Sequence, residues 1–260
     1  MIITTAFDET EYLLTQARNL SNEYGLPFVP RQKRTIKSML ETTDPQIFVA
    51  NSLRGLSYYE KGKQEVFFHP NLAFQRIAQS TNGQSDGLLS ACGMEKGMTF
   101  FDGTAGLLSD TIVASSIADK VIACEKSFPL FLVLKEGIKF YQRQHPEKSA
   151  LIDKIELFHS DNLELLQALK DESIDVVYFD FMFEKTIESS IGIQTIKSVA
   201  SFDKITARHV KESLRVAKKR VIVKSSYGNP LLKALGFKMN LKNKRKRFYY
   251  ATLEKTTVER

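Results

Sequence analysis

The most informative run in this sequence is Phe100-Phe101-Asp102-Gly103-Thr104-Ala105-Gly106. Its pattern is typical of an apolar strand that ends in an acid and continues into a turn of small residues. The apolar residues of the next segment, 107–118, have helical spacing. Glycine and alanine let the backbone approach a ligand closely, and the first turn of a helix offers free N–H groups. The run therefore predicts a ligand of nucleotide size at the carboxyl edge of a parallel sheet.

Strands and helices alternate from Gly87 onward. We predict strands over 99–102, 120–125, 155–159, 175–180 and 220–224, with helices beginning near Leu107, Phe128, Asn162 and Thr206. Continuous apolar runs such as Val176–Phe179 suit strands that are buried on both faces of a parallel sheet. Residues 237–241 and 248–253 predict two further strands joined by a basic turn. We expect an α/β fold with a Rossmann-like, mostly parallel sheet that closes in a C-terminal antiparallel hairpin.

The first part of the chain has a different pattern. It predicts strands and helices in mixed order, with strands over 1–5, 47–50, 56–59 and 65–68 and helices over 9–24, 34–40 and 71–79. The polar run from Ser80 to Gly87 is a candidate boundary. We therefore predict a small α+β domain over residues 1–82 and a second domain over residues 83–260.

Composition places the chain among folded globular proteins, since 43% of its 260 residues are hydrophobic and 26% are charged. Its two cysteines, Cys92 and Cys124, lack the spacing of metal ligands. We expect reduced thiols in a cytoplasmic protein without a bound metal. No apolar run approaches the roughly 20 residues of a membrane span, and no signal-peptide pattern follows Met1, so no membrane partner is expected.

The net charge of +7 is concentrated in two basic clusters. The first consists of Arg31, Lys33, Arg34 and Lys37, and the second of Lys238, Lys242, Lys244, Arg245, Lys246 and Arg247. Either cluster alone is typical of a solvated face. Two clusters together favour RNA or DNA as a partner.

Four acids stand at the ends of successive predicted strands: Asp102, Glu125, Asp161 and Asp180. Any one of them could be an ordinary helix cap, but four beside a small-residue turn favour a nucleoside-bearing cofactor. Glu125, about 20 residues beyond the turn, can accept hydrogen bonds from ribose hydroxyls. Asp161 can receive the amino group of an adenine or cap the next helix.

The same turn indicates which cofactor to expect. It lacks the Gly-x-Gly-x-x-Gly pattern of dinucleotide sites, because Leu107 and Leu108 stand where a glycine would be needed beside a pyrophosphate. A Walker phosphate loop is also absent from the sequence. A nucleoside without phosphates fits better, and S-adenosylmethionine (SAM) is the common one.

Five segments follow one another as they do in class I methyltransferases: 102–110, 124–126, 159–162, 176–183 and 220–224. The chain resembles more closely, from about Gly87 to its end, the small-subunit ribosomal RNA guanine-N2 methyltransferases of the J type and their Gram-positive relatives. The resemblance implies a SAM site on Ser109, Asp110, Glu125, Lys126, Asp161, Asn162 and Asp180. Asp102 and Gly106 of the small-residue turn complete the predicted cofactor site.

The family motif after the fourth strand is Asp-Pro-Met-Phe, and here it is Asp180-Phe181-Met182-Phe183. The resemblance implies methylation of an exocyclic amino group in RNA. The Asp180 carboxylate and the Phe181 carbonyl would accept hydrogen bonds from that amino group, and Phe183 would stack on the base. Asp180 and Phe183 are thus the predicted catalytic residues. Arg76, Lys224 and the turn 242–247 are predicted phosphate contacts.

The chain departs from the family pattern in two places. Phe181 replaces the proline of the motif, and Leu108-Ser109 replaces a Gly-Arg pair. Two alternatives therefore stay open. The first is a methyltransferase that acts on a protein or a small molecule, which would bind cofactor without salt-sensitive affinity for RNA. The second is a catalytically retired RNA-binding protein that has kept the methyltransferase fold.

Overall fold

The computed structural model describes residues 1–181, 204–225, 229–239 and 248–255. Contacts within these ranges divide the chain into two compact units. The first holds Met1–His69 together with Phe128–Lys148, and the second holds Pro70–Ser127 and the described residues from Ser149 onward. The boundary between residues 82 and 83 stays a prediction.

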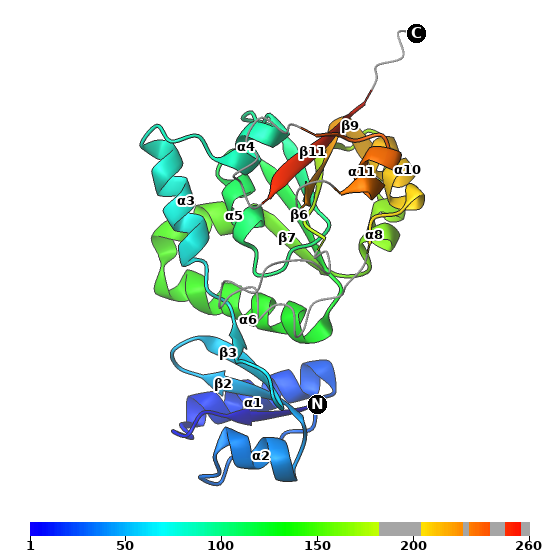
Figure 1. The fold of residues 1–260 in the computed structure, drawn as a ribbon. Helices are drawn as coiled ribbons and strands as arrows, with labels where there is room; N and C mark the ends of the chain where they lie inside the picture. Colours follow the sequence, from blue (N-terminus) through cyan, green and yellow to red (C-terminus); the bar gives the residue numbers. More distant parts are fainter. Residues whose placement is uncertain (182–203, 226–228, 240–247, 256–260) are drawn as a thin grey trace. The chain divides into compact units, whose positions relative to one another are not determined.

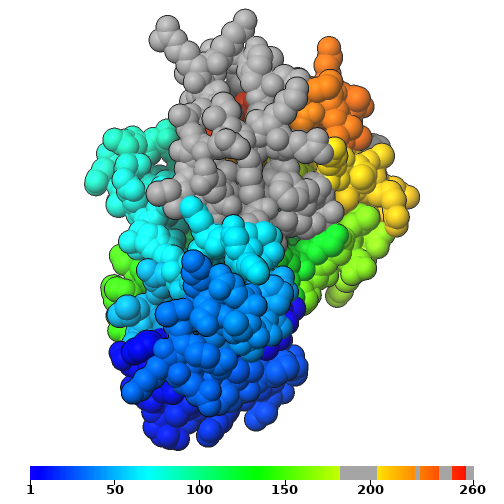
Figure 2. Space-filling model, turned by 60° about the horizontal axis from the view of Figure 1, so that its bottom comes forward, coloured from blue at the N-terminus to red at the C-terminus, as the bar shows by residue number. Residues whose placement is uncertain are grey.

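A four-stranded sheet forms the centre of the first unit, in the order β1-β2-β3-β4. Its strands are β1 (Ile2–Thr5), β2 (Gln46–Asn51), β3 (Gly55–Glu60) and β4 (Val66–Phe67), and only β1 pairs in parallel, with β2. Its helices are α1 (Glu11–Tyr24), α2 (Ile36–Thr42) and α6 (Phe128–Gln144), followed by the single turn η1 (Pro146–Lys148). Figure 2 shows the residues of the N-terminal segment, in blue, closely packed together.

Helix α6 approaches the small sheet closely. An added Cβ on Gly137 of α6 would overlap the Cβ of Phe68. At the other contact, a Cβ on Gly55 would lie 2.7 Å from the Cβ of Phe140. Two glycines therefore allow a helix and a strand to pack at a distance that larger residues would prevent.

The second unit is built on a seven-stranded sheet in the order β10-β11-β9-β8-β5-β6-β7. Its strands are β5 (Thr99–Asp102), β6 (Lys120–Glu125), β7 (Ile155–His159), β8 (Ile174–Phe179), β9 (Ala217–Ser225), β10 (Lys238–Met239) and β11 (Tyr249–Glu254). Strands β5 to β9 are parallel, while β11 runs antiparallel to both β9 and β10. The expected α/β fold, with a mostly parallel sheet and an antiparallel C-terminal pair, is confirmed.

Helices lie on both faces of this sheet (Figure 1). One face carries α4 (Gly87–Cys92) and α5 (Ser109–Ser115), and the other carries α8 (Asn162–Ala168) and α10 (Ala207–Val216). Phe101 and Phe179 belong to the core on the side of α8 and α10, whereas Phe100 and Tyr178 stack 5.7 Å apart. Alternate residues of a strand point to opposite faces, so both faces are buried and the strands read as continuous apolar runs.

Three short helices were not predicted: α4, α7 (Ser149–Ile152) and α11 (Pro230–Ala234). The polar run predicted as a boundary contains the end of α3 (Asn71–Thr81) and Asp86, which caps α4. Among the described residues, no helix is long and apolar enough to cross a membrane, and no cluster of three metal-ligating side chains occurs.

The strand order sets the place of a site. From β5 the chain proceeds through β6 to β7 on one side, while β8 and β9 lie on the other side. The order therefore reverses between β5 and β8, which are direct neighbours with Asp102 opposite Tyr178. Ligands of open α/β sheets bind outside the carboxyl ends of the strands at such a point.

Candidate functional site at the carboxyl edge of the sheet

The turn after β5 is held by Asp102, which is buried. Its Oδ2 accepts a hydrogen bond from the Thr111 hydroxyl at 2.6 Å, and its Oδ1 accepts one from the Thr104 N–H at 3.0 Å. Gly103 follows, where an added Cβ would overlap the ring of Phe179. Burial raises the pKa of Asp102 to about 7 despite these hydrogen bonds.

Leu108, at the N-terminal end of α5, has an unusual backbone. Its φ is 62°, in the left-handed region that favours glycine, and its side chain is fully buried. The resemblance placed a glycine at this position. The fold keeps the backbone that glycine would adopt, and the packing of the leucine side chain offsets the strain.

Glu125, at the end of β6, faces the turn. Its Oε2 accepts a hydrogen bond from the Gly106 N–H at 3.2 Å, and its Oε1 accepts one from the Ser127 N–H at 2.8 Å. Gly106 has a φ of 52°, and a Cβ added there would lie 3.8 Å from the Thr104 carbonyl oxygen. Burial raises the pKa of Glu125 to about 7 because these hydrogen bonds offset only part of its desolvation.

Asp161 and Lys126 form an ion pair at the same edge. Asp161 caps α8, since its Oδ1 accepts a hydrogen bond from the Leu163 N–H at 2.9 Å. Its Oδ2 lies 2.9 Å from Lys126 Nζ. Burial opposes ionisation of Asp161, but the Lys126 ammonium and the capped N–H groups lower its pKa.

Asn162 and His209 stabilise the turn through a chain of hydrogen bonds. The Asn162 amide donates to the Gly103 carbonyl at 3.0 Å. Because the Thr206 N–H donates to His209 Nδ1, the ring proton is on Nε2, which donates to Asn162 Oδ1 at 3.0 Å. Sequence reasoning assigned no role to His209. Its position three residues after Thr206 matches a capping box, and this pattern could have indicated it.

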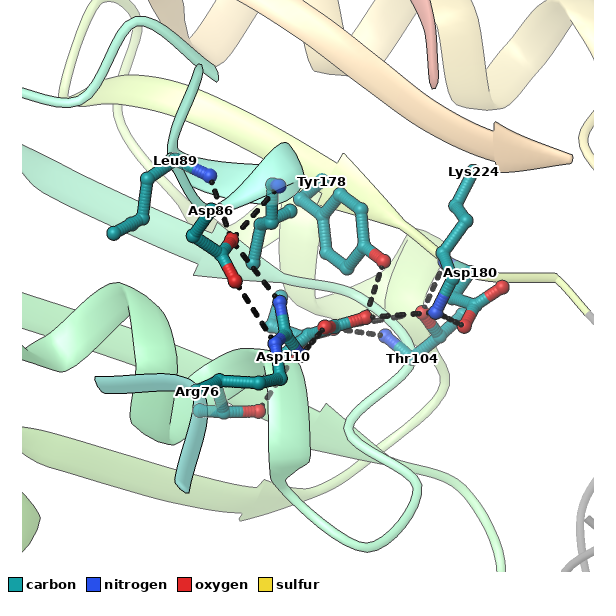
Figure 3. A network of polar contacts seen from close by, with 11 residues as sticks. Arg76, Asp86, Leu89, Thr104, Asp110, Tyr178, Asp180 and Lys224 are labelled. Carbon is teal, nitrogen blue, oxygen red and sulfur yellow. Dashed lines mark hydrogen bonds and ion pairs between the residues drawn. The ribbon is translucent and has the colours of Figure 1, made fainter. Parts of the chain in front are cut away.

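Asp180 follows β8 and is linked to two other charged residues (Figure 3). Its backbone N–H donates to Thr104 Oγ1 at 2.6 Å, and its Oδ2 pairs with Lys224 Nζ at 2.7 Å. Lys224, near the end of β9, also lies 3.1 Å from Asp110 Oδ2. One lysine thus joins two carboxylates that come from different elements.

Asp110 is held by a cation on its other side. Its Oδ1 pairs with Arg76 of α3 at 2.6 Å, and Tyr178 donates its hydroxyl to Oδ2 at 2.6 Å. Arg76 also pairs with Asp86 at 2.9 Å. Asp86 and Tyr178 were missing from the predicted site, because neither stands at a strand end.

These contacts set the ionisation of the two carboxylates. Burial opposes ionisation of Asp110, but Lys224 and Arg76 lower its pKa to about 2. Burial raises the pKa of Asp180 and repulsion from Asp110 adds to this effect, while attraction to Lys224 offsets only part of it. Asp180 is therefore the carboxylate of this pair that takes up a proton more readily.

The other predicted residues are distributed as follows. Ser109 is the half-buried first residue of α5, and Phe181 is buried beside Phe179. Phe183 and the turn 242–247 lie outside the described residues. Arg76 and Lys224, predicted as phosphate contacts, are each paired with two carboxylates.

The first basic cluster is only partly available to a partner. Arg31 is buried and donates to the carbonyls of Thr5 and Arg34. Arg34 donates to the Pro30 carbonyl at 2.7 Å. These two arginines hold a loop of the first unit, and Lys33 and Lys37 are the exposed members.

The family model described as "Putative SAM-dependent methyltransferase" matches residues 31–251. The chain belongs to this methyltransferase family. It is 31% identical over 256 residues to protein YpiP of Bacillus subtilis, with 97% of this chain and 99% of the relative covered. It is 24% identical over 249 residues to the ribosomal RNA small subunit methyltransferase J of Alteromonas mediterranea, with 93% and 91% covered.

A solved structure supports the same architecture. The methyltransferase shares its fold with a SAM-dependent methyltransferase of Neisseria gonorrhoeae, at a TM-score of 0.63 and 19% identity. The alignment covers 100% of this chain and 98% of the other. The likeness therefore extends over both units.

The donor set at this edge suits the cofactor of the methyltransferase, S-adenosylmethionine. Glu125 and Asp161 present carboxylates, and Gly106 has no side chain that would crowd a ligand. The cations described above, Arg76, Lys126 and Lys224, are already paired with carboxylates, so they match a nucleoside better than a pyrophosphate. Excess negative charge also favours a sulfonium cation.

Proposed function

We propose that this methyltransferase transfers a methyl group from SAM to the exocyclic N2 of a guanine in small-subunit ribosomal RNA. The observation that carries the proposal is the position of Asp180. It stands at the carboxyl end of β8, directly beside the glycine turn, and its side chain is 37% exposed despite the ion pair with Lys224. The similarity to ribosomal RNA small subunit methyltransferases J supports ribosomal RNA as the substrate.

The cofactor would lie along the turn. Glu125 would accept hydrogen bonds from the ribose hydroxyls, as buried acids at this position do in nucleoside sites. Asp161 and Asn162, with Lys126 beside them, would border the adenine. Asp102, Gly106 and Ser109 would line the methionine side. SAM supplies an electrophilic methyl group.

The chain supplies orientation rather than a strong base. The lone pair of a guanine amino group is delocalised into the ring, so the nitrogen is a weak nucleophile. The Asp180 carboxylate and the Phe181 carbonyl would accept its two N–H bonds and direct the lone pair toward the methyl group. Asp180 would hold the proton that leaves the nitrogen after transfer, and Phe183 would stack on the base.

Phe181 can fix the backbone at the position where the family motif has a proline. Proline would restrict the backbone at this position. The Phe181 side chain is only 4% exposed and stacks on Phe179 at 5.1 Å, with the His209 ring 5.8 Å away. A buried ring anchors the backbone by packing, so the carbonyl keeps a fixed direction. This packing favours an active enzyme over the retired RNA-binding protein.

The test is identification of the methylated product. Small ribosomal subunits, and their naked RNA, are prepared from cells that lack this protein and incubated with it and isotope-labelled SAM. Mass spectrometry of the digested nucleosides is expected to show labelled N2-methylguanosine. A label on another nucleoside contradicts the guanine assignment. A label on ribosomal protein, or no transfer to either substrate, contradicts the RNA assignment.

A further inference from the structure

Lys224 occupies a place that phosphate binding does not explain. Its ammonium lies 2.7 Å from Asp180 Oδ2 and 3.1 Å from Asp110 Oδ2, and the side chain is only 21% exposed. The Phe248 ring lies 4.9 Å from the same ammonium. Figure 3 shows this lysine beside Asp180 and Asp110. Two carboxylates and the Phe248 ring therefore surround the charge that was predicted to contact RNA.

Asp110 is itself a fixed anchor. Its side chain is 12% exposed, and both oxygens are engaged by Arg76, Tyr178 and Lys224. Arg76 is fixed in turn by Asp86, the N-cap of α4. The chain of contacts runs from Arg76 of α3 through Asp110 of α5 to Lys224 of β9. Asp110 therefore fixes the Lys224 ammonium, which also pairs with Asp180.

We propose that Lys224 is a positioning residue for methyl transfer. It holds the Asp180 carboxylate in one orientation, keeps it ionised, and leaves Oδ1 to accept the amino group of the substrate. Asp110 serves this arrangement by anchoring Lys224, in place of the predicted contact with cofactor. The role of Asp180 as acceptor, and hence this inference, rests on the function proposed above.

The charges around Asp180 explain why the lysine is needed. Asp102 of β5 and Asp110 of α5 are both carboxylates that repel it. Tyr178 of β8 and Tyr250 of β11 face the same group of charges, and neither carries a positive charge. Lys224 is the cation that pairs with Asp180 among the described residues. Without it, Asp180 would be protonated at higher pH and could not accept from the amino group.

The test compares K224M, which removes the charge, with K224R, which keeps it. The pKa of Asp180 is measured by 13C NMR of the carboxyl carbons, with D180N used for assignment. The pH profile of kcat is measured on the RNA substrate. K224M should raise the pKa of Asp180 and shift the rising limb of the pH profile of kcat by about one pH unit to higher pH. At a pH below this limb, kcat should therefore fall about tenfold. The RNA KM should stay within about threefold, since no phosphate contact is lost.

K224R keeps the positive charge, so its pH profile of kcat should have its rising limb at the wild-type pH. K219M is the matched control, because Lys219 lies on the same strand, is 42% exposed and pairs with Glu95 at 3.4 Å, away from the carboxyl edge. It should change neither the pKa nor kcat. SAM titration verifies that each variant is folded, and K224Q replaces K224M if the latter does not fold.

Two outcomes overturn the proposal. In one, the neutral variants leave the pKa of Asp180 and the limb of kcat unchanged. In the other, kcat is retained while KM for RNA rises and the salt dependence of RNA binding falls by about one charge, as expected for a phosphate contact. The NMR measurement needs no RNA. A shifted pKa without any methylation of guanine would therefore contradict the proposed function and leave the ion pair standing.

Discussion

Two buried carboxyls, Asp102 and Glu125, lie against the same small-residue turn. Burial raises the pKa of each to about 7, although backbone N–H groups or a hydroxyl donate to both. Their ionisation therefore changes near neutral pH, in contrast to Asp110, whose pKa is about 2. A carboxyl that meets ribose hydroxyls accepts best when ionised, so cofactor binding depends on pH.

We expect the affinity for SAM to rise between pH 6 and pH 8. A single carboxyl with a pKa near 7 changes its ionised fraction by about tenfold over this interval, so the Kd should fall by up to that factor. E125Q should bind more weakly and with a smaller pH dependence. Calorimetric titration measures both, with E156Q on the exposed edge strand β7 as control. If the Kd for SAM depends on pH equally in wild type and E125Q, the role of Glu125 is contradicted.

At the scale of elements, the start of α5 stores backbone strain. Leu108 has a φ of 62° and is fully buried, so one residue combines an unfavourable backbone with favourable packing. Helix α5 then presents Asp110 and Thr111 to the acidic edge. The strain therefore belongs to the element that positions two residues of the site.

Shortening the side chain separates the two contributions. L108A loses packing and keeps the left-handed strain, whereas L108G loses slightly more surface and removes the strain, which is about 1–2 kcal/mol. We expect L108G to be the more stable of the two by about 1 kcal/mol, the reverse of the usual order. Urea unfolding measures this difference. Leu88 is buried in α4 and has no positive φ, so there L88A should be more stable than L88G. If the alanine variant is the more stable one at both positions, backbone strain at Leu108 is contradicted.

For the whole molecule, the buried acids predict how stability depends on pH. The folded pKa values of Asp102 and Glu125, about 7, lie above their ordinary values of 3.8 and 4.5. Above pH 7 the folded state holds ionised buried carboxyls, so stability increases as the pH falls from 8 toward 5. Asp110 has the opposite shift, but its contribution is lost only near pH 2.

The melting temperature without cofactor should therefore rise between pH 8 and pH 5.5, by at least about 2 °C. E125Q should show a smaller rise because a neutral amide does not titrate. Calorimetry or circular dichroism measures both proteins in the same buffers. A wild-type melting temperature that falls over this interval by more than that of E125Q would contradict the raised pKa.

Much of the second sheet could be predicted from sequence. The predicted bounds of β5, β6 and β7 agree with the structure. Strands β5 and β6 have apolar cores, and β7 alternates apolar and polar residues over 155–157, as an edge strand does. Short helices such as α4 and α11 were missed, since six or five residues are too few to show a helical period. The acids were found because parallel strands bring their carboxyl ends to one edge.

The partners of those acids were harder to predict. Arg76 reaches Asp110 across 34 residues, and Lys224 reaches it across 114. No local pattern encodes such pairs, so both cations were interpreted as phosphate contacts. The tertiary fold buries the acids, and buried carboxylates require nearby cations or hydrogen-bond donors.

The most direct test of the account is methyl transfer by wild type and D180N on the same unmodified small-subunit RNA. Wild type should form N2-methylguanosine. D180N should lose at least about 100-fold in kcat, because the acceptor that orients the amino group is gone, while the Kd for SAM stays within about threefold. Transfer by D180N at the wild-type rate would contradict the central claim that Asp180, at the carboxyl end of β8, carries the chemistry.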